Sequence, residues 1–176
     1  MNDKTLIMET SASMLQTLHR IPWFNELSTE ALQRLARISS MRKLDAGEVL
    51  FCEGDAENCL YILLSGEVEL ETHAPGYGPV RIFIAEPLDL LGWSSLTPVV
   101  RQRTDTAIAR SECTLVSFNN ELLRQACDED HETGYVIMRR IANVAASRLL
   151  TTRLHLFKVI QEQSDRIHQG ASTKQD

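Results

Sequence analysis

The chain has 176 residues, of which 43% are hydrophobic and 24% charged, and its formal net charge is −6. This length favours one domain with a core of its own, and the composition is that of a globular protein. The acidic balance and the scattered basic residues argue against a nucleic-acid-binding surface. No apolar run reaches the roughly 18 residues of a membrane span, and the first residues lack the pattern of a signal peptide. We therefore expect a cytoplasmic protein that binds neither nucleic acid nor membrane.

The cysteines and histidines do not form a recognisable site. Four cysteines and five histidines are spread along the chain, without the spacing of metal ligands or a disulfide framework. Cys52, Cys59 and Cys113 stand in or beside apolar patterns, where a free cysteine behaves as a small hydrophobe. No nucleophile with a base and no paired carboxylates stand out. The sequence thus predicts no metal site, no catalytic residue and no enzyme.

The N-terminal part of the chain carries helical patterns. Apolar residues between Thr5 and His19 have a weak helical spacing, so residues 1–20 are predicted to form an N-terminal helical segment. The stretch from Ile21 to Phe24 contains a proline and interrupts this pattern. Ser28 can then cap a second helix, because apolar residues follow it at helical spacing.

From Arg42 to Phe118 the pattern changes to short strands separated by glycine-containing turns. The stretch from Ala74 to Pro79 contains two glycines and two prolines and is typical of a hairpin loop. Many short strands of this kind indicate a β-roll or jelly-roll barrel, here within an α+β fold. The predicted strands are Met41–Leu44, Val49–Cys52, Cys59–Ser65, Val68–Thr72, Val80–Ala85, Thr106–Arg110 and Thr114–Phe118.

Helical patterns return after the strands. Asn119 or Asn120 caps a short helix that ends near Cys127, and a long C-terminal helix is predicted over residues 131–167. The polar residues 168–176 are predicted to form a disordered tail. The roll with its flanking helices is assigned to residues 21–130.

The long helix carries a heptad pattern. Apolar and small residues repeat in steps of four and three, as in the seam of a two-stranded coiled coil. This stripe can pack against the chain's own roll or against the same stripe of a second copy. We favour the homodimer, because Ile137, Ile141 and Val144 supply another apolar stripe for the roll. The heptad residues are Met138, Ala142, Ala145, Leu149, Thr152, Leu156 and Val159.

Several motifs together resemble a known family. They are the segment from Gly47 to Asp55, Gly66 after an apolar strand, the segment from Leu91 to Leu96, and the segment from Arg103 to Ala107. They resemble the cyclic-nucleotide-binding domain of catabolite-activator-type regulators, kinase regulatory subunits and gated channels. The resemblance implies a β-roll followed by a dimerisation helix. In catabolite-activator-type regulators a winged helix-turn-helix domain follows that helix. This chain stops soon after it, so we expect no DNA-reading domain and a separate output protein.

The resemblance also implies a ligand site. In the family, a Gly-Glu pair opens a short helix beside the nucleotide phosphate, and an Arg-Ser/Thr pair clamps that phosphate. Gly92 matches the glycine, and Ser94 and Ser95 can form the short helix. Arg103 would be the phosphate cation and Thr104 a hydroxyl donor. The alternative for Arg103 is a salt bridge on the surface.

Two positions depart from the family. Trp93 stands where the family has the Glu that accepts the ribose 2′-hydroxyl, and an indole can only donate a hydrogen bond. Trp93 can fill the pocket, point away while Ser94 or Ser95 takes the hydroxyl, or shape the pocket for another anion. Asp105 stands where the family has a small residue, and its carboxylate can repel a phosphate or pair with Arg101 or Arg103.

One further match lies on the long helix. Thr151 and Thr152 occupy the place of the Thr-Ser pair that contacts the base in catabolite-activator-type proteins. The resemblance therefore implies a regulatory module that binds a small anionic effector and signals through its long helix to a partner protein. Cyclic AMP or another cyclic nucleotide is the possible effector, and no cofactor is expected. The alternative is a ligand-free, degenerate domain that acts as a dimeric scaffold or docking module.

Overall fold

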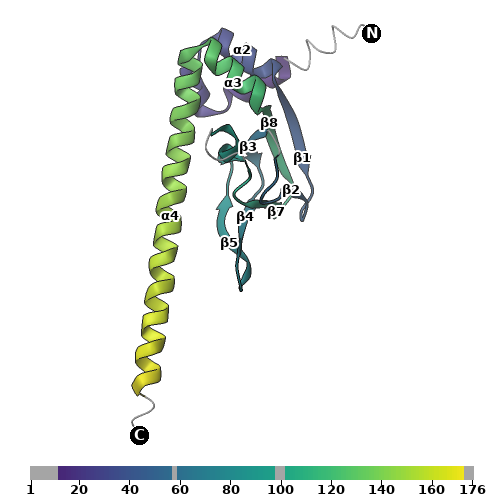
Figure 1. The fold of residues 1–176 in the computed structure, drawn as a ribbon. Coiled ribbons are helices and arrows are strands. Elements are labelled where there is room, and N and C mark those ends of the chain that lie inside the picture. The colour runs from purple at the N-terminus through teal and green to yellow at the C-terminus, as the bar shows by residue number, and fades with distance from the viewer. Residues whose placement is uncertain (1–11, 57–58, 98–101, 173–176) are drawn as a thin grey trace. The chain divides into compact units, whose positions relative to one another are not determined.

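The computed structural model describes residues 12–56, 59–97 and 102–172. The chain divides into two compact units, residues 1–141 and residues 142–176. The first unit contains the strands and the shorter helices, and the second is the C-terminal part of one long helix (Figure 1).

Helices cover one end of the first unit. Residues 12–19 are helical, whereas the expected helical residues before them lie outside the described part of the chain. A 3-10 helix, η1 (Pro22–Glu26), precedes helix α2 (Thr29–Arg37). The Ser28 hydroxyl accepts a hydrogen bond from the Ala31 amide at 3.1 Å, so the predicted N-cap is confirmed.

In the described part of the chain, eight strands form two antiparallel sheets of four strands each, which confirms the predicted β-roll in an α+β fold. The strand order is β1-β8-β3-β6 in one sheet and β2-β7-β4-β5 in the other. Every predicted strand is present with ends shifted by at most two residues, and of the described strands only the two-residue β6 was not predicted. The bounds are β1 Ser39–Leu44, β2 Val49–Phe51, β3 Cys59–Ser65, β4 Val68–Ala74, β5 Gly78–Ala85, β6 Leu90–Leu91, β7 Thr106–Ala109 and β8 Cys113–Asn119.

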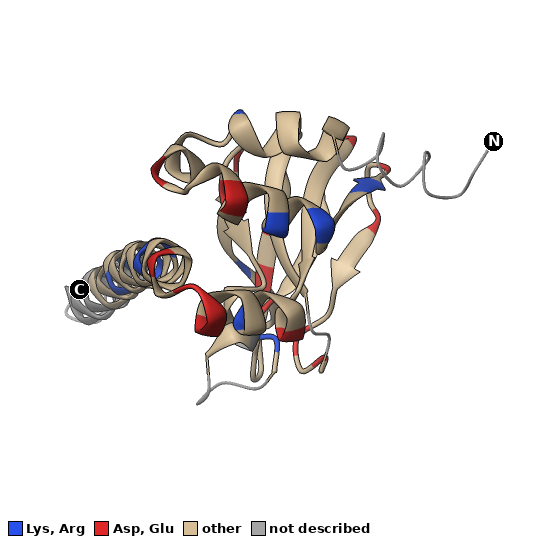
Figure 2. Ribbon diagram, turned by 90° about the horizontal axis from the view of Figure 1, so that it is seen from above, with Lys and Arg blue, Asp and Glu red and all other residues tan. Residues whose placement is uncertain are grey.

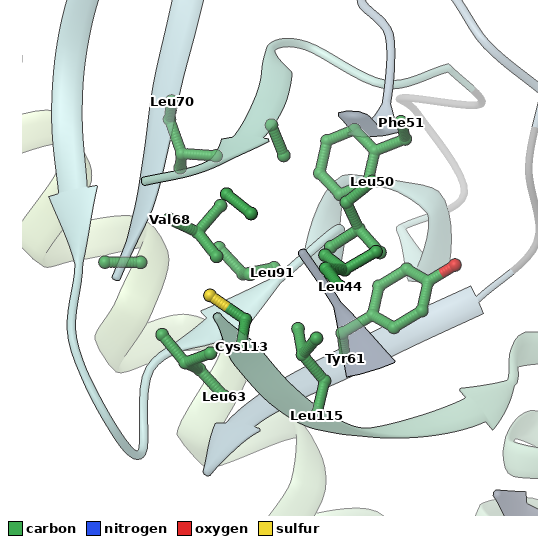
Figure 3. Packing of buried hydrophobic residues seen from close by; sticks show 13 residues of the cluster. Leu44, Leu50, Phe51, Tyr61, Leu63, Val68, Leu70, Leu91, Cys113 and Leu115 are labelled. Atoms are coloured by element: carbon green, nitrogen blue, oxygen red, sulfur yellow. The ribbon is translucent and has the colours of Figure 1, made fainter. Parts of the chain in front are cut away.

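The core of the roll lies between the two sheets. Tyr61, Leu63 and Leu115 from one sheet meet Phe51 and residues of β4 from the other (Figure 3). The core residues alternate along the strands with more exposed ones, because successive side chains of a strand point to opposite faces. The strands themselves were predicted from short apolar runs separated by glycine-containing turns.

Gly66 makes the turn between β3 and β4 possible. Its φ of +90° lies in the left-handed region that favours glycine. A Cβ atom at this position would lie 2.4 Å from the Glu112 carbonyl oxygen, so the chain also needs a glycine here for space. The glycine that follows β3 in the sequence is thus required for steric reasons.

Two helices follow β8. Helix α3 (Asn120–Glu129) is capped by Asn119, whose side-chain oxygen accepts from the amides of Glu121 and Leu122. Helix α4 runs from His131 to Ser172. It therefore continues past the predicted end at residue 167, and residues 168–172 are helical where a disordered tail was expected; residues 173–176 lie outside the described residues. Polar residues end a pattern of burial, but they do not by themselves end a helix.

The two units differ in how their apolar and charged residues are distributed. Basic and acidic residues are interspersed over the helices and strands of the first unit (Figure 2). In the second unit, large apolar side chains are exposed, among them Leu149 at 71% and Leu154 at 58%. Within the described residues, no helix combines the length and the apolar character that a membrane crossing requires.

Candidate functional site

Gly92 stands where β6 passes into the 3-10 helix η2 (Trp93–Leu96), the short helix that the sequence predicted. Its φ is +73°, in the left-handed region. A Cβ atom on Gly92 would lie 1.8 Å from Nη1 of Arg103 and 3.0 Å from the Cys59 carbonyl oxygen. The glycine is therefore required because the guanidinium of Arg103 occupies the space beside it.

Arg103 is buried, with only 2% of its surface exposed. Its Nη1 donates a hydrogen bond to the Gly92 carbonyl at 2.7 Å, and its Nη2 donates to the Cys59 carbonyl at 2.6 Å. The sequence offered a surface salt bridge as the alternative for this residue, and the burial shows that alternative to be wrong. Gly92 and Arg103, predicted to share a site from positions eleven residues apart, do lie together.

Aromatic rings support the guanidinium. The Cζ atom of Arg103 lies 4.3 Å from the centre of the Phe51 ring and 5.8 Å from that of Tyr61. The two rings stack on each other with their centres 6.3 Å apart. Cation–π attraction is strongest where water is excluded, so Phe51 and Tyr61 compensate part of the cost of burying this charge.

The backbone around Arg103 is held by the turn that follows β2. The Arg103 amide donates to the Asp55 carbonyl at 3.0 Å, and the Gly54 amide donates to the Arg103 carbonyl at 2.9 Å. Arg103 lies three residues before β7, which begins at Thr106 as predicted. These two hydrogen bonds hold the Arg103 backbone as strand pairing would, and they fix the direction in which the Arg103 side chain enters the roll.

The electrostatics of this site favour an anion. Burying a guanidinium is costly unless its donors are satisfied, and charge-assisted bonds to an anion are stronger than bonds to neutral carbonyls. The fork of Arg103 donors suits two oxygens of one phosphate or carboxylate. Because both ends of the guanidinium donate to backbone carbonyls, an anion that bound here would have to displace the Gly92 and Cys59 contacts.

The other predicted residues around η2 and Arg103 are placed less uniformly. Ser94 is buried, and its carbonyl accepts from the amide and the hydroxyl of Thr97, so it stabilises the end of η2. Ser95 belongs to η2, and its side chain is outside the described part of the structure. Trp93 is partly buried and opens η2.

Thr104 and Asp105 bind each other. The Thr104 hydroxyl donates to Oδ1 of Asp105, and the Thr104 side chain is exposed. The expectation that Asp105 pairs with Arg103 does not match the hydrogen bonds of the guanidinium to Gly92 and Cys59, and Arg101 lies outside the described residues. Thr104 is thus adjacent to the Arg103 backbone, but its hydroxyl is engaged by a neighbour.

Thr151 and Thr152 belong to the other unit of the chain. Both lie on α4 within residues 142–176, where Thr151 is half-buried and Thr152 is exposed. Gly92 and Arg103 belong to the first unit. The contact of the two threonines with a base stays a sequence-based prediction.

Three contributions to the site were not predicted. The Cys59 carbonyl accepts from Arg103, and Phe51 and Tyr61 contact its guanidinium. A backbone acceptor has no sequence signature, because every residue has a carbonyl. The two aromatic residues were recognisable only as strand residues, since β-branched and aromatic side chains are common in strands.

A contact links the start of α4 to the strand that leads into the site. Nη2 of Arg140 donates to the Leu88 carbonyl at 3.2 Å, and the Leu88 amide donates to the Leu63 carbonyl at 2.7 Å. Leu88 has a φ of +78°, which is unusual for a side chain of this size. The tight turn between β5 and β6 is thus held by β3 on one side and by α4 on the other.

An open groove of about 590 Å³ lies elsewhere on the roll. Glu53 and Glu71 contribute carboxylates to its lining, and Glu53 accepts from the His73 amide at 2.8 Å. Carboxylates repel an anion, so this groove does not fit the ligand that Arg103 suits. Among the described residues, no group of three or more His, Cys, Asp or Glu side chains is placed to hold a metal ion.

Comparison with known proteins agrees with this geometry. Residues 41–130 match the family model of the cyclic nucleotide-binding domain. A CRP-like cAMP-activated global transcriptional regulator from Mycobacterium tuberculosis is 27% identical over 147 residues, which cover 84% of this chain and 63% of the relative. The chain thus spans less than two thirds of the length of this regulator.

Two solved structures illustrate the similarity in fold. The N-terminal domain of a transcriptional regulator from Streptomyces coelicolor A3(2) has a TM-score of 0.60 and 28% identity, over 74% of this chain and 92% of that one. A cyclic nucleotide-binding domain from Methylobacillus flagellatus KT has a TM-score of 0.70 and 19% identity, over 85% and 84%. The family model matches more than half of the residues. The chain therefore belongs to the cyclic nucleotide-binding domain family.

Proposed function

We propose that this chain is an effector-binding regulatory module that takes a small anion, with a cyclic nucleotide as the first candidate, between Gly92 and Arg103. The observation that carries the proposal is a buried guanidinium that donates to backbone carbonyls beside a glycine without room for a Cβ atom. A fixed, desolvated cation of this kind attracts anions more strongly than a surface arginine does. Membership of the family and the name of the cAMP-activated relative support the choice of ligand.

Binding would change the contacts of Arg103. A phosphate that accepts from Nη1 and Nη2 competes with the carbonyls of Gly92 and Cys59, which now accept from these atoms at 2.7 and 2.6 Å. Release of these carbonyls frees the backbone at both ends of the site, at the start of β3 and at the start of η2. The ligand therefore has a different affinity for the two arrangements, which is the physical requirement for a signal.

The signal would reach α4 through the turn before β6. Leu88 and Gly92 are separated by Asp89 and the two residues of β6. Arg140 of α4 holds the Leu88 carbonyl, so a shift of β6 changes the position of an acceptor that α4 contacts. We infer that α4 passes this change to a separate partner protein, and that Thr151 and Thr152 contribute to contact with the base.

The module would work as a homodimer. The heptad residues Leu149, Leu156 and Val159 are 71%, 55% and 50% exposed, which is costly for large apolar side chains. Ile137 and Ile141, the stripe predicted to serve the roll, are 3% exposed. A second copy is the simplest partner for the exposed heptad stripe, because each chain then covers the stripe of the other.

A ligand-free scaffold is the second candidate. It is favoured by the two carbonyls that already accept from Arg103 and by the Thr104 hydroxyl, which is engaged by Asp105. Trp93 in place of a ribose acceptor points the same way, because its indole can only donate. In this case the buried arginine is structural and the roll serves dimerisation or docking.

A thermal-shift titration of the full chain with cyclic AMP, cyclic GMP and cyclic dinucleotides tests the proposal. A ligand that binds only the folded state stabilises it by about 2.7 kcal/mol at a hundredfold excess over its dissociation constant. We expect a dose-dependent rise in Tm that is absent in Arg103→Ala. The matched control is Arg110→Ala, because Arg110 is exposed on the surface and pairs with Glu69. If no nucleotide shifts the wild-type Tm, the scaffold is the better account.

A further inference from the structure

Helix α4 presents a second line of exposed apolar side chains beside the heptad stripe. Leu150 and Leu154 are each 58% exposed, and Phe157 is 51% exposed. Their spacing of four and seven residues places them on one face of the helix. We refer to these three residues as the second stripe, and to Ala145, Leu149, Thr152, Leu156 and Val159 as the seam.

The second stripe does not belong to the seam. At about 100° of rotation per residue, it is centred roughly 100° around the helix from Leu149. A two-stranded coiled coil buries only its a and d positions, and the residues of the second stripe fall at b and f. A dimer formed through the seam therefore leaves Leu150, Leu154 and Phe157 uncovered.

Cations border the second stripe. The guanidinium of Arg153 lies over the Phe157 ring, with its Cζ atom 5.4 Å from the ring centre. By helical geometry Lys158 stands on the opposite border, one step beyond Leu154. Between residues 142 and 161 the sequence contains three basic residues and no carboxylate, in a chain whose net charge is −6. This part of α4 is thus an apolar line between positive charges.

We propose that the second stripe docks an amphipathic helix with acidic borders, supplied by the output partner. The apolar positions at i, i+4 and i+7 are the anchors by which one helix packs along another. Glutamate or aspartate beside the apolar face of the partner would pair with Arg153 and Lys158 across the contact. The inference rests on the proposed function in one respect, because it assumes that the seam is occupied by a second copy.

The charges and the width of the stripe decide between this partner and two others. A further copy of the chain packed in parallel register would bring Arg153 and Lys158 against the same cations, whereas a helix with acidic borders pairs with them. A membrane surface takes a whole apolar face of a helix in its plane. When the seam is buried in a dimer, only a narrow stripe with cations on both sides is left, and this fits one helix.

The test uses the full chain, without nucleotide, and two fluorescent helical peptides of about 20 residues. Both peptides carry leucines at i, i+4 and i+7 spacing; one has glutamates on the borders of this face, and the other has lysines at the same positions. We expect the glutamate peptide to bind at least about tenfold more tightly in fluorescence anisotropy. Arg153→Glu should shift the preference toward the lysine peptide.

Two variants locate the contact. Leu154→Ser combined with Phe157→Ser should weaken the glutamate peptide at least about tenfold and leave the sedimentation mass unchanged, because these residues lie outside the seam. Arg110→Ala changes a surface pair on the roll and should leave peptide binding within about twofold. The Arg103→Ala variant should bind the peptide as wild type does, so that failure of the effector proposal is seen separately in the nucleotide titration.

The contrary results are distinct. Equal binding of both peptides, or binding of neither, overturns the proposal. A double variant that sediments as a monomer shows that a second copy covers the stripe. Binding of the wild-type chain to vesicles of phosphatidylcholine and phosphatidylserine that is lost in the double variant shows that a membrane covers it. Each of the last two outcomes replaces the acidic helix with another occupant of the second stripe.

Discussion

The roll and the C-terminal part of α4 differ in how far their apolar side chains are buried. In the roll, 13 residues from both sheets form one cluster, of which Leu63 and Leu115 are 0% exposed (Figure 3). In residues 142–172, the large apolar side chains that the structure describes are half exposed or more, apart from Val144. A helix gains most of its stability in proteins from packing of its apolar face. The roll is therefore stabilised by its own contacts, whereas this helix requires a neighbour.

Matched truncations of one leucine in each region test this contrast directly. Leu63→Ala should lower the free energy of unfolding by about 2 to 5 kcal/mol, because it removes buried methyl groups and leaves a cavity. Leu154→Ala, at a side chain that is 58% exposed, should change it by no more than about 0.5 kcal/mol. Urea denaturation at one fixed protein concentration measures both. Similar losses at the two sites would mean that the helix is covered in the protein as it exists in solution.

Substitution in the seam tests whether the neighbour is a second copy. Leu149→Glu places a carboxylate among apolar side chains of both chains, and we expect the dimer dissociation constant to rise at least about a hundredfold. Ser147→Glu is the matched control, because Ser147 is exposed and falls at an f position, outside the seam. Sedimentation velocity over a range of concentrations measures the effect. A persistent Leu149→Glu dimer would contradict the heptad interpretation.

The fold was predictable because its determinants are local. Short apolar runs with glycine-containing turns between them indicated the strands, and the cap at Ser28 follows from the hydroxyl before an apolar helix. Strand β6 was missed because two residues are too few to form a recognisable run. The end of α4 was missed because polar residues with adequate helix propensity continue a helix without a pattern of burial.

Of the site, only the proximity of Gly92 and Arg103 was predictable from the sequence. The spacing of Gly92 and Arg103 indicated that they belong together, and the structure places the Arg103 guanidinium where a Cβ atom on Gly92 would be. The burial of Arg103 and its bonds to carbonyls were not predictable, since they depend on how the turn after β2 holds its backbone. The direction of a side chain in a loop is set by tertiary contacts, and a single sequence does not reveal these contacts.

Trp93 allows the ligand site of the roll to be probed by a gain of function. If a cyclic nucleotide binds beside Gly92, the wild type should bind cyclic AMP and 2′-deoxy-cyclic AMP with equal affinity, because an indole cannot accept from the 2′-hydroxyl. Trp93→Glu supplies an acceptor and should favour cyclic AMP by about tenfold, the value of one charge-assisted hydrogen bond. Trp93→Leu is the control without an acceptor. Calorimetry with both nucleotides measures the ratio, and a wild type that already discriminates would show that another residue holds the ribose.

The smallest effect is expected at Asp130, where α3 ends and α4 begins. Its Oδ2 accepts from the Thr133 hydroxyl at 2.7 Å, and its Oδ1 accepts from the amides of Glu132 and Thr133. These hydrogen bonds, that of the Thr133 hydroxyl foremost, hold the pKa of the Asp130 carboxyl below its ordinary value of 3.8. A carboxyl whose pKa is lower in the folded state stabilises the fold above its ordinary pKa, and this contribution is lost as the pH falls through the folded value.

Asp130→Ala should therefore lower the Tm slightly near pH 7, and the difference from wild type should shrink at about pH 3 and below. Asp130→Asn separates the two causes, because an amide oxygen can still accept from the backbone but carries no charge. It should fall between wild type and Asp130→Ala. Circular dichroism melts at both pH values measure the three proteins. A deficit in Tm for Asp130→Ala that is the same at both pH values would show that Asp130 stabilises the junction of α3 and α4 through its hydrogen bonds and not through its charge.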